Sequence, residues 1–206
     1  MGYVKASVRR GQIVAAARAV LSRDGVAGTT LRAVAAEAEV PLGTLHYVFP
    51  SKEQLITAVL EDVQDEVSAV FRAAETHAGL DHALRTGLEN YWRQLVVNDH
   101  QVALMRHELF IYALRTPGQE NLARWQIEGY TRIVAQWAEQ AANNAGDTCA
   151  VPFDTLARAL VGSVMGIVLE YLSDHDKARS RRDLHALTDM LVRLAAPRPA
   201  ANTTES

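Results

Sequence analysis

The chain has 206 residues, of which 49% are hydrophobic and 22% are charged, and its formal net charge is −3. This composition lies near the average of globular proteins, which excludes intrinsic disorder and fibrous repeats. The single cysteine, Cys149, cannot form an internal disulfide, and no signal-peptide pattern follows Met1, so we expect a cytoplasmic protein. The most apolar stretch, 156–172, falls short of the ~18 uninterrupted apolar residues of a membrane helix, so no membrane span is expected.

The charge is unevenly distributed along the chain. Residues 1–55 contain seven basic and four acidic side chains, whereas the remainder contains 14 basic and 20 acidic ones. A basic segment on an acidic remainder indicates that this segment alone meets a polyanion. A chance fluctuation of a few charges is the alternative.

The apolar periodicity is helical along nearly the whole chain, and alternating strand patterns with hairpin turns are missing. We therefore predict an all-α fold with about nine helices. Gly25 is expected to end the first helix, Thr29 or Thr30 to cap the second, and Ser51 to cap the fourth. The expected helices are, to within a few residues, 7–23, 31–38, 41–48, 52–75, 80–98, 100–115, 119–145, 153–173 and 180–195.

Two short helices, 31–38 and 41–48, follow a longer helix and precede another, which is the pattern of a helix-turn-helix DNA reader. Short helix pairs also occur in ordinary helical bundles. In the second short helix, Leu45 and Phe49 are expected to be buried anchors. Thr44 and Tyr47 are three residues apart and share a face that can meet DNA.

Several local signals then fall in a fixed order: Gly25, the string Thr29-Thr30-Leu31-Arg32, the pair Val34-Ala35, and the string from Gly43 through Tyr47-Val48-Phe49-Pro50-Ser51-Lys52 to Leu55. In order and spacing, the block from Gly11 to Leu60 resembles the N-terminal domain of the TetR family of bacterial transcriptional regulators. The resemblance implies a helix-turn-helix DNA-binding domain at 1–50 and a larger helical ligand-binding and dimerisation domain at 51–195. The composition of 196–206 predicts a flexible tail.

The resemblance also implies a homodimer whose recognition helices, here 41–48, enter successive major grooves of a palindromic double-stranded DNA operator. Thr44 and Tyr47 match positions that touch phosphates or bases, and Lys52 matches a lysine that contacts the DNA backbone. Arg32 is a further phosphate candidate. The full set of expected DNA-binding residues is Arg32, Pro41, Leu42, Gly43, Thr44, His46, Tyr47 and Lys52. Lys5, Arg9 and Arg10 form either a basic arm or ordinary solvated charge.

Four positions depart from the family pattern. Glu39 stands in the turn where the family usually has glycine, at a position that prefers a positive φ, so we expect local strain or a shifted turn. Leu42 and Val48 replace residues that are often polar, and His46 stands where tyrosine is common. With few hydrogen-bond donors on this helix, base reading is expected to depend on methyl contacts and on DNA shape.

The remainder of the chain carries large side chains that suit a ligand pocket. Glu108 and Glu170 interrupt apolar runs, and a carboxylate among aromatic side chains suits a cationic or hydroxylated ligand. The candidate ligand residues are Trp92, Met105, Glu108, Tyr112, Trp125, Tyr130 and Glu170. Alternatively, the aromatic side chains form the core, and each glutamate pairs with an arginine or faces water.

A wide apolar stripe in 153–173, with small residues beside it, predicts a two-fold dimer interface shared with 184–194. The candidate interface residues are Leu156, Leu160, Val164, Ile167, Val168, Tyr171, Leu187 and Leu191. An internal core helix is the competing interpretation.

Catalysis is not expected. His107-Glu108 and His175-Asp176 are pairs of neighbours that point about 100° apart on a helix, and no metal-ligand spacing, nucleophile elbow or phosphate loop accompanies them. We therefore expect a ligand-responsive homodimeric repressor without metal or cofactor, in which the fourth helix transmits ligand binding to the DNA-binding domain. The alternative is a helical ligand-binding or protein-interaction module without specific DNA binding.

Overall fold

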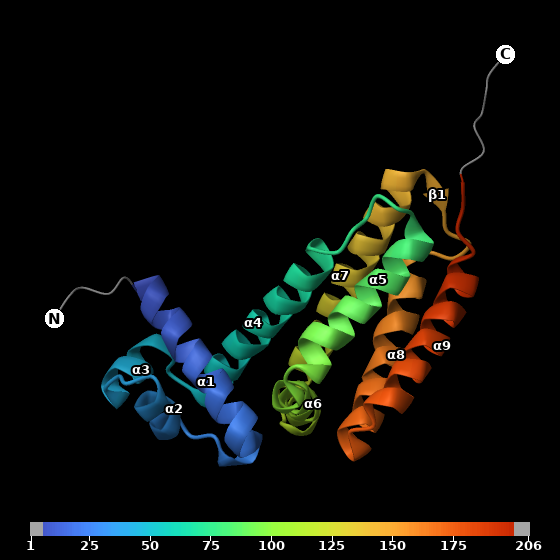
Figure 1. Cartoon of the computed structure of the whole chain (residues 1–206). Helices are drawn as coiled ribbons and strands as arrows, with labels where there is room; N and C mark the ends of the chain where they lie inside the picture. Colours follow the sequence, from blue (N-terminus) through green and yellow to red (C-terminus); the bar gives the residue numbers. More distant parts are fainter. Residues whose placement is uncertain (1–5, 200–206) are drawn as a thin grey trace. The chain divides into compact units, whose positions relative to one another are not determined.

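The computed structural model describes residues 6–199, which form nine α-helices, one π-helical segment and two short strands (Figure 1). The α-helices are α1 (Ala6–Gly28), α2 (Leu31–Glu37), α3 (Leu42–Val48), α4 (Lys52–Arg72), α5 (Leu80–Trp92), α6 (His100–Arg115), α7 (Glu120–Ala145), α8 (Phe153–Asp174) and α9 (Lys177–Ala195). The π-helical segment η1 (Arg93–Val97) continues α5. The all-α fold and the number of helices are confirmed.

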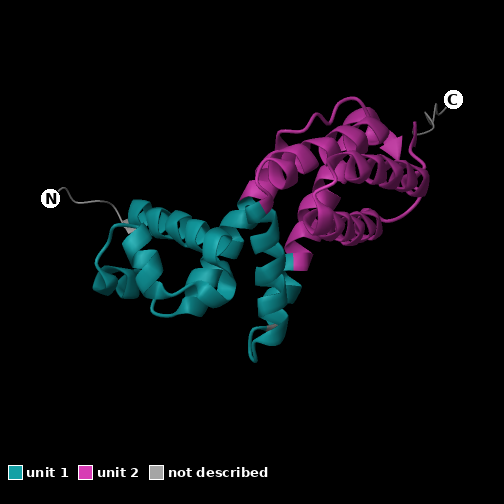
Figure 2. Ribbon diagram, turned by 60° about the horizontal axis from the view of Figure 1, so that its bottom comes forward, with its two compact units in different colours: residues 1–65, 101–126 teal, residues 66–100, 127–206 magenta. Residues whose placement is uncertain are grey.

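The chain divides into two compact units (Figure 2). Unit 1 comprises residues 1–65 and 101–126, and unit 2 comprises residues 66–100 and 127–206. Most of α6 and the first turns of α7 therefore belong to the same unit as α1–α3, although they lie far from them in the sequence. The functional division at residue 50 is a different partition and remains a prediction.

The first three helices form a small core in unit 1, and we call residues 6–51, which carry them, the head. Ile13, Ala17 and Val20 are fully buried, as their helical spacing predicts. Thr30 caps α2 by accepting a hydrogen bond from the Ala33 N–H (3.1 Å). Ser51 accepts one from the Gln54 N–H (3.2 Å) at the start of α4, so both predicted caps are confirmed.

Gly25 acts differently from the predicted helix stop. Its backbone (φ 69°, ψ 174°) interrupts α1, but helical residues continue to Gly28. Glycine suits this position because a positive φ is disfavoured for residues with a Cβ. The first helix is therefore longer than expected and contains a kink.

Unit 2 is held together by close helix contacts. Gly87 on α5 lies directly against the ring of Trp137 on α7, which also packs against Phe71 with ring centroids 4.9 Å apart. The helices α8 and α9 run side by side (Figure 1). Such contacts build a single helical core in this unit.

By length and composition alone, α8 could cross a membrane, contrary to our expectation that no stretch would qualify; it is the one such helix among the residues that the structure describes. The test is weak because the core helix of a soluble protein also passes it. In this fold α8 packs on α9 and turns Leu156, Leu160 and Val168 into the core.

Part of the predicted flexible tail is ordered. Strand β1 (Asp147–Thr148) pairs antiparallel with β2 (Arg198–Pro199), and the Ala150 N–H donates to the Ala195 carbonyl (2.7 Å). The proline-containing composition of this segment gave no indication of the short β1–β2 pair. Residues 200–206 of the predicted tail lie outside the described residues.

Candidate DNA-binding site

The turn between α2 and α3 places the two helices of the predicted motif. Val34, Ala35 and Ala38 are buried on the inner face of α2 and in the turn. Glu39 has a φ of 53°, and the next N–H, that of Val40, donates to the Ala35 carbonyl (3.0 Å). The expected positive φ at Glu39 is confirmed, so this residue tolerates a conformation that usually favours glycine.

One side of helix α3 packs into the core of the head, and the other side is exposed to solvent. Leu45 is 0% exposed and Phe49 is 3% exposed, as predicted for the two anchors. Tyr47 is 88% exposed, and its neighbour His46 is also exposed. A large aromatic side chain with so little packing contributes little to the stability of the head, so Tyr47 is accessible to a partner.

The remaining α3 candidates lie around the helix start. Helix α3 begins at Leu42, and Pro41 occupies the position before it, where its carbonyl accepts from the Thr44 and Leu45 N–H groups. Pro41 and Gly43 are exposed, whereas Leu42 and Thr44 are half-buried. The exposed part of the motif is therefore narrow, and it offers few hydrogen-bond donors.

Most basic side chains of the head are already engaged. Arg10 pairs with Glu61 (3.2 Å) and lies over the Phe49 ring, 5.3 Å from its centroid. Arg18 pairs with Asp62 (3.1 Å) and Arg23 with Glu37 (3.0 Å). Arg10 is thus part of the folded head, whereas Lys5, the first residue of the predicted basic arm, lies outside the described residues.

Arg32 and Lys52 differ sharply. Arg32 is exposed at the start of α2. Lys52 is half-buried, and its Nζ donates to the Val26 carbonyl (2.7 Å). Burial lowers the pKa of Lys52, an effect that the nearby carboxylate of Glu53 partly offsets. The structure therefore presents Arg32, and not Lys52, as an open cation.

The predicted ligand residues are divided between the two units. Met105, Glu108, Tyr112 and Trp125 fall in unit 1, and Trp92, Tyr130 and Glu170 fall in unit 2. Both Met105 and Trp92 are buried: the Met105 sulfur faces the Ser22 hydroxyl (3.4 Å), and the Trp92 ring packs edge-on against Tyr171. Tyr112 and Tyr130 are half-buried, and Trp125 is 36% exposed.

The two predicted ligand carboxylates have protein partners. Glu170 is exposed and pairs with Arg179 (2.9 Å), which is the alternative that the sequence left open. Glu108 accepts a hydrogen bond from the Val26 N–H (3.3 Å). Neither contact could be inferred from the apolar runs around the two glutamates.

The predicted dimer stripe is mostly internal. Seven of its eight side chains are buried within this one chain, and only Ile167 is half-buried; the seven are Leu156, Leu160, Val164, Val168, Tyr171, Leu187 and Leu191. A second apolar face of the same helices remains exposed, with Leu169 on α8 and Met190 and Leu194 on α9. A two-fold contact at these helices would therefore use the second face.

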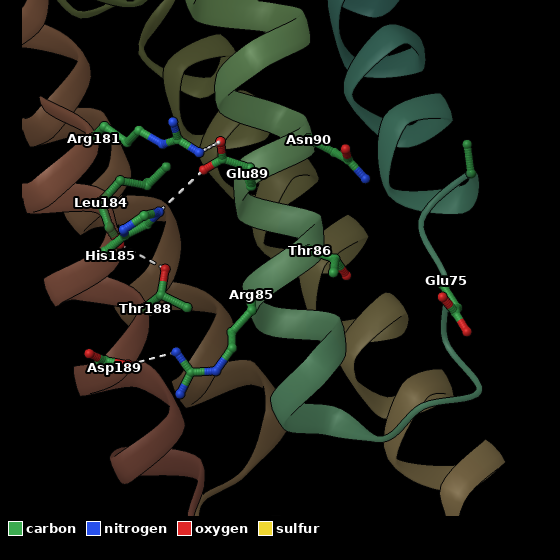
Figure 3. A pocket seen from close by; sticks show the side chains of 11 residues that line it. Glu75, Arg85, Thr86, Glu89, Asn90, Arg181, Leu184, His185, Thr188 and Asp189 are labelled. Carbon is green, nitrogen blue, oxygen red and sulfur yellow. Dashed lines mark hydrogen bonds and ion pairs between the residues drawn. The ribbon is translucent and has the colours of Figure 1, made fainter. Parts of the chain in front are cut away.

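An open groove of about 740 Å³ lies between α5 and α9 in unit 2 (Figure 3). Most of its charged residues bind one another: Glu89 pairs with Arg181 (3.2 Å) and faces His185 (3.6 Å), and Arg85 pairs with Asp189 (2.6 Å). These contacts join α5 to α9. None of the predicted ligand residues lines the groove, and no group of three metal-ligating side chains occurs within residues 6–199.

Comparison with known proteins gives the same assignment for the head. Residues 13–59 match the family model of bacterial regulatory proteins of the tetR family. The chain is 29% identical over 174 residues to the HTH-type nicotine-responsive transcriptional repressor HdnoR of Paenarthrobacter nicotinovorans, covering 84% of this chain and 88% of that protein.

Solved structures agree along almost the whole chain. The multidrug binding protein EbrR in complex with ethidium has 28% identity and a TM-score of 0.69, covering 91% of this chain and 98% of its own. A TetR family member from Streptomyces coelicolor has 29% identity and a TM-score of 0.67, with the same coverage. The matched helix-turn-helix, the all-α fold of residues 6–199 and these relatives support a transcriptional regulator of the bacterial TetR family.

Proposed function

We propose that the protein is a homodimeric repressor that binds a palindromic operator and releases it when a small molecule binds. The observation that carries the DNA-binding part is the exposed face of α3. Leu45 and Phe49 are buried and anchor α3 in the head, while Tyr47 has 88% of its surface exposed. Two such helices in a dimer, about 34–36 Å apart, would read successive major grooves of one inverted repeat.

The chemistry of this face predicts how the operator is read. Arg32 and the hydroxyl groups of Thr44 and Tyr47 are suited to phosphate or base contacts. Pro41, Leu42 and Gly43 bring the backbone close to the groove, and Leu42 offers an apolar contact to a thymine methyl group. With so few donors, we propose that DNA shape contributes much of the sequence preference.

The homodimer is proposed to form through the exposed apolar face of α8 and α9. On α8 this face contains Gly162, Gly166 and Leu169, and on α9 it contains Met190 and Leu194. An added Cβ at Gly162 or Gly166 would meet no atom of this chain within 4 Å. A glycine inside a helix lowers its stability, so a close approach by a partner helix explains the two residues better than any contact within the chain.

Small-molecule release is proposed from the relatives. One relative is a nicotine-responsive repressor, and another was solved in complex with ethidium. Aromatic residues such as Trp125 and Tyr130 remain the candidates for an effector contact, and we place the protein in the cytoplasm with its DNA. The alternative, a helical module without specific DNA binding, shares the fold but predicts no enriched DNA site.

Selection of genomic fragments by the purified protein, followed by footprinting, tests the proposal. We expect a protected inverted repeat, and Tyr47→Ala should weaken its binding by about 30-fold or more, because each of two heads loses a contact worth roughly 1 kcal/mol or more. Leu114→Ala, which truncates another exposed apolar side chain, is the matched control. No enriched repeat, or equal binding by both variants, contradicts the proposal.

A further inference from the structure

The kink in α1 leaves backbone groups that a continuous helix would have satisfied. Gly25 interrupts the helix, and its carbonyl accepts a hydrogen bond from the Thr29 hydroxyl (2.7 Å). The next residue, Val26, is buried. Its N–H and carbonyl therefore need partners from elsewhere in the fold.

Two charged side chains from other helices supply these partners. The Glu108 carboxylate of α6 accepts from the Val26 N–H (3.3 Å), and the Lys52 ammonium of α4 donates to the Val26 carbonyl (2.7 Å). In each contact a charged side chain meets a backbone group of opposite partial charge. Such hydrogen bonds are stronger than those between neutral groups. We call Glu108, Val26 and Lys52 the kink clamp.

The surroundings of the clamp are closely packed. A Cβ on Gly25 would lie 3.1 Å from Glu108 Oε2, so the carboxylate rests directly on the kink. Three residues earlier on both helices, the Ser22 hydroxyl donates to the Met105 sulfur (3.4 Å). Two successive contacts therefore fix α6 along the end of α1 within unit 1.

We infer that Glu108 and Lys52 are positioning residues for the recognition helix, acting through the kink clamp. This inference rests on the proposed operator binding and gives Lys52 a role other than the DNA-backbone contact that the family resemblance implies. The chain on both sides of residues 101–126 continues into unit 2. The clamp is thus a point where the head is fastened to a segment that is covalently joined to unit 2 at both ends.

The clamp should raise the affinity for the operator by increasing the fraction of heads in which α3 is placed correctly for binding. When the end of α1 is loosened, α3 is correctly placed for a smaller fraction of the time, and the apparent dissociation constant rises by the inverse of that fraction. Binding to DNA of unrelated sequence depends on charge and not on this placement. Loss of the clamp should therefore lower the ratio of operator affinity to non-specific affinity.

The first test compares three variants of the full chain on the selected operator and on unrelated DNA. Glu108→Ala should reduce the affinity ratio by about 3- to 10-fold. Glu108→Gln keeps an oxygen that accepts from the Val26 N–H and should restore most of the loss. Glu128→Ala removes an exposed carboxylate from α7 and matches the charge change, so it should behave as the wild type.

Hydrogen exchange provides a readout that does not require DNA. The Val26 amide should exchange faster in Glu108→Ala than in the wild type or in Glu128→Ala, because its acceptor is gone. Equal exchange in all three proteins overturns the clamp. If the wild type selects no operator while the exchange difference is present, the proposed function fails and the clamp stands.

The second test separates the two roles of Lys52 by salt dependence. A lysine that neutralises one phosphate contributes about 0.9 to the slope of log affinity against log salt concentration. Lys52→Gln should weaken operator binding but leave this slope unchanged. A slope reduced by about 0.9 per head, with unchanged Val26 exchange, would assign Lys52 to a phosphate contact and overturn its positioning role.

Discussion

Gly166 in the middle of α8 gives a direct test of the proposed dimer surface. Its exposed position leaves room for a Cβ within this chain, where an added methyl group would meet no atom within 4 Å. Alanine is about 1 kcal/mol more favourable than glycine inside a helix. Gly166→Ala should therefore raise the free energy of unfolding of the isolated protomer by about 0.5–1 kcal/mol.

The same methyl group should act in the opposite direction on the dimer. If a partner helix packs closely against Gly166, the two added Cβ atoms together force a displacement that costs about 1–3 kcal/mol per dimer. A loss of that size raises the dimer dissociation constant by about 5- to 150-fold. Opposite signs for protomer stability and dimer affinity distinguish an interface glycine from a glycine on an open surface.

Sedimentation over a dilution series measures the dimer dissociation constant, and chemical unfolding at low protein concentration measures protomer stability. Gly11→Ala is the matched control, because Gly11 also lies inside a helix with nothing within 4 Å of an added Cβ. It should stabilise the protomer without weakening the dimer. If Gly166→Ala does the same, the proposed α8 surface is wrong.

Three further substitutions test the local structure. Gly87→Ala would place a Cβ against the Trp137 ring, closer than two carbon atoms can pack. An overpacking cost of about 1–3 kcal/mol should exceed the helix gain, and urea unfolding should show a net loss of about 1–2 kcal/mol. Glu39→Gly should raise the free energy of unfolding by about 0.5–1 kcal/mol, since relief of the positive φ outweighs the added chain entropy; a loss would show that this turn is unstrained. The backbone N–H of Glu53 and the Ser51 hydroxyl lower the pKa of the Glu53 carboxyl below its ordinary value of 4.5. Its contribution to stability is therefore complete above pH 4.5 and is lost as the pH falls through the lowered pKa, so acid unfolding of the wild type should be steeper than that of Glu53→Gln; identical acid profiles would contradict this.

Local signals predicted the head well. The caps at Thr30 and Ser51 depend on residues within one helical turn, so they could be found in the sequence. The left-handed Glu39 followed from its place in a recognised turn. In contrast, the partner of Glu108 is 82 residues away in the chain, and no periodicity of α6 identifies it.

The dimer stripe shows a different limit of periodicity. Helix α8 is apolar on two faces, one with Leu160 and Val164 and the other with Gly166 and Leu169. The helical periodicity of apolar residues is the same on both faces. The prediction chose the first face because its side chains are larger. Only the burial of Leu160 and Val164 within the chain shows that the first face is core. Glycines inside the helix, such as Gly162 and Gly166, are the better sequence signal for the outer face.

The basic side chains of residues 1–55 have a different role in the folded protein from the one that the sequence predicted. The basic excess of residues 1–55 predicted a polyanion partner, but Arg10, Arg18 and Arg23 are held by carboxylates and Lys52 by a backbone carbonyl. Much of this basic excess therefore stabilises the position of the helices and is not presented to a partner. The DNA contact that we propose, the exposed face of α3 with Tyr47 together with Arg32 on α2, is narrower than the net charge of residues 1–55 would suggest. If DNA shape and apolar contacts carry much of the recognition, as we propose, binding depends on the correct placement of α3, and the kink clamp is proposed to act on that placement.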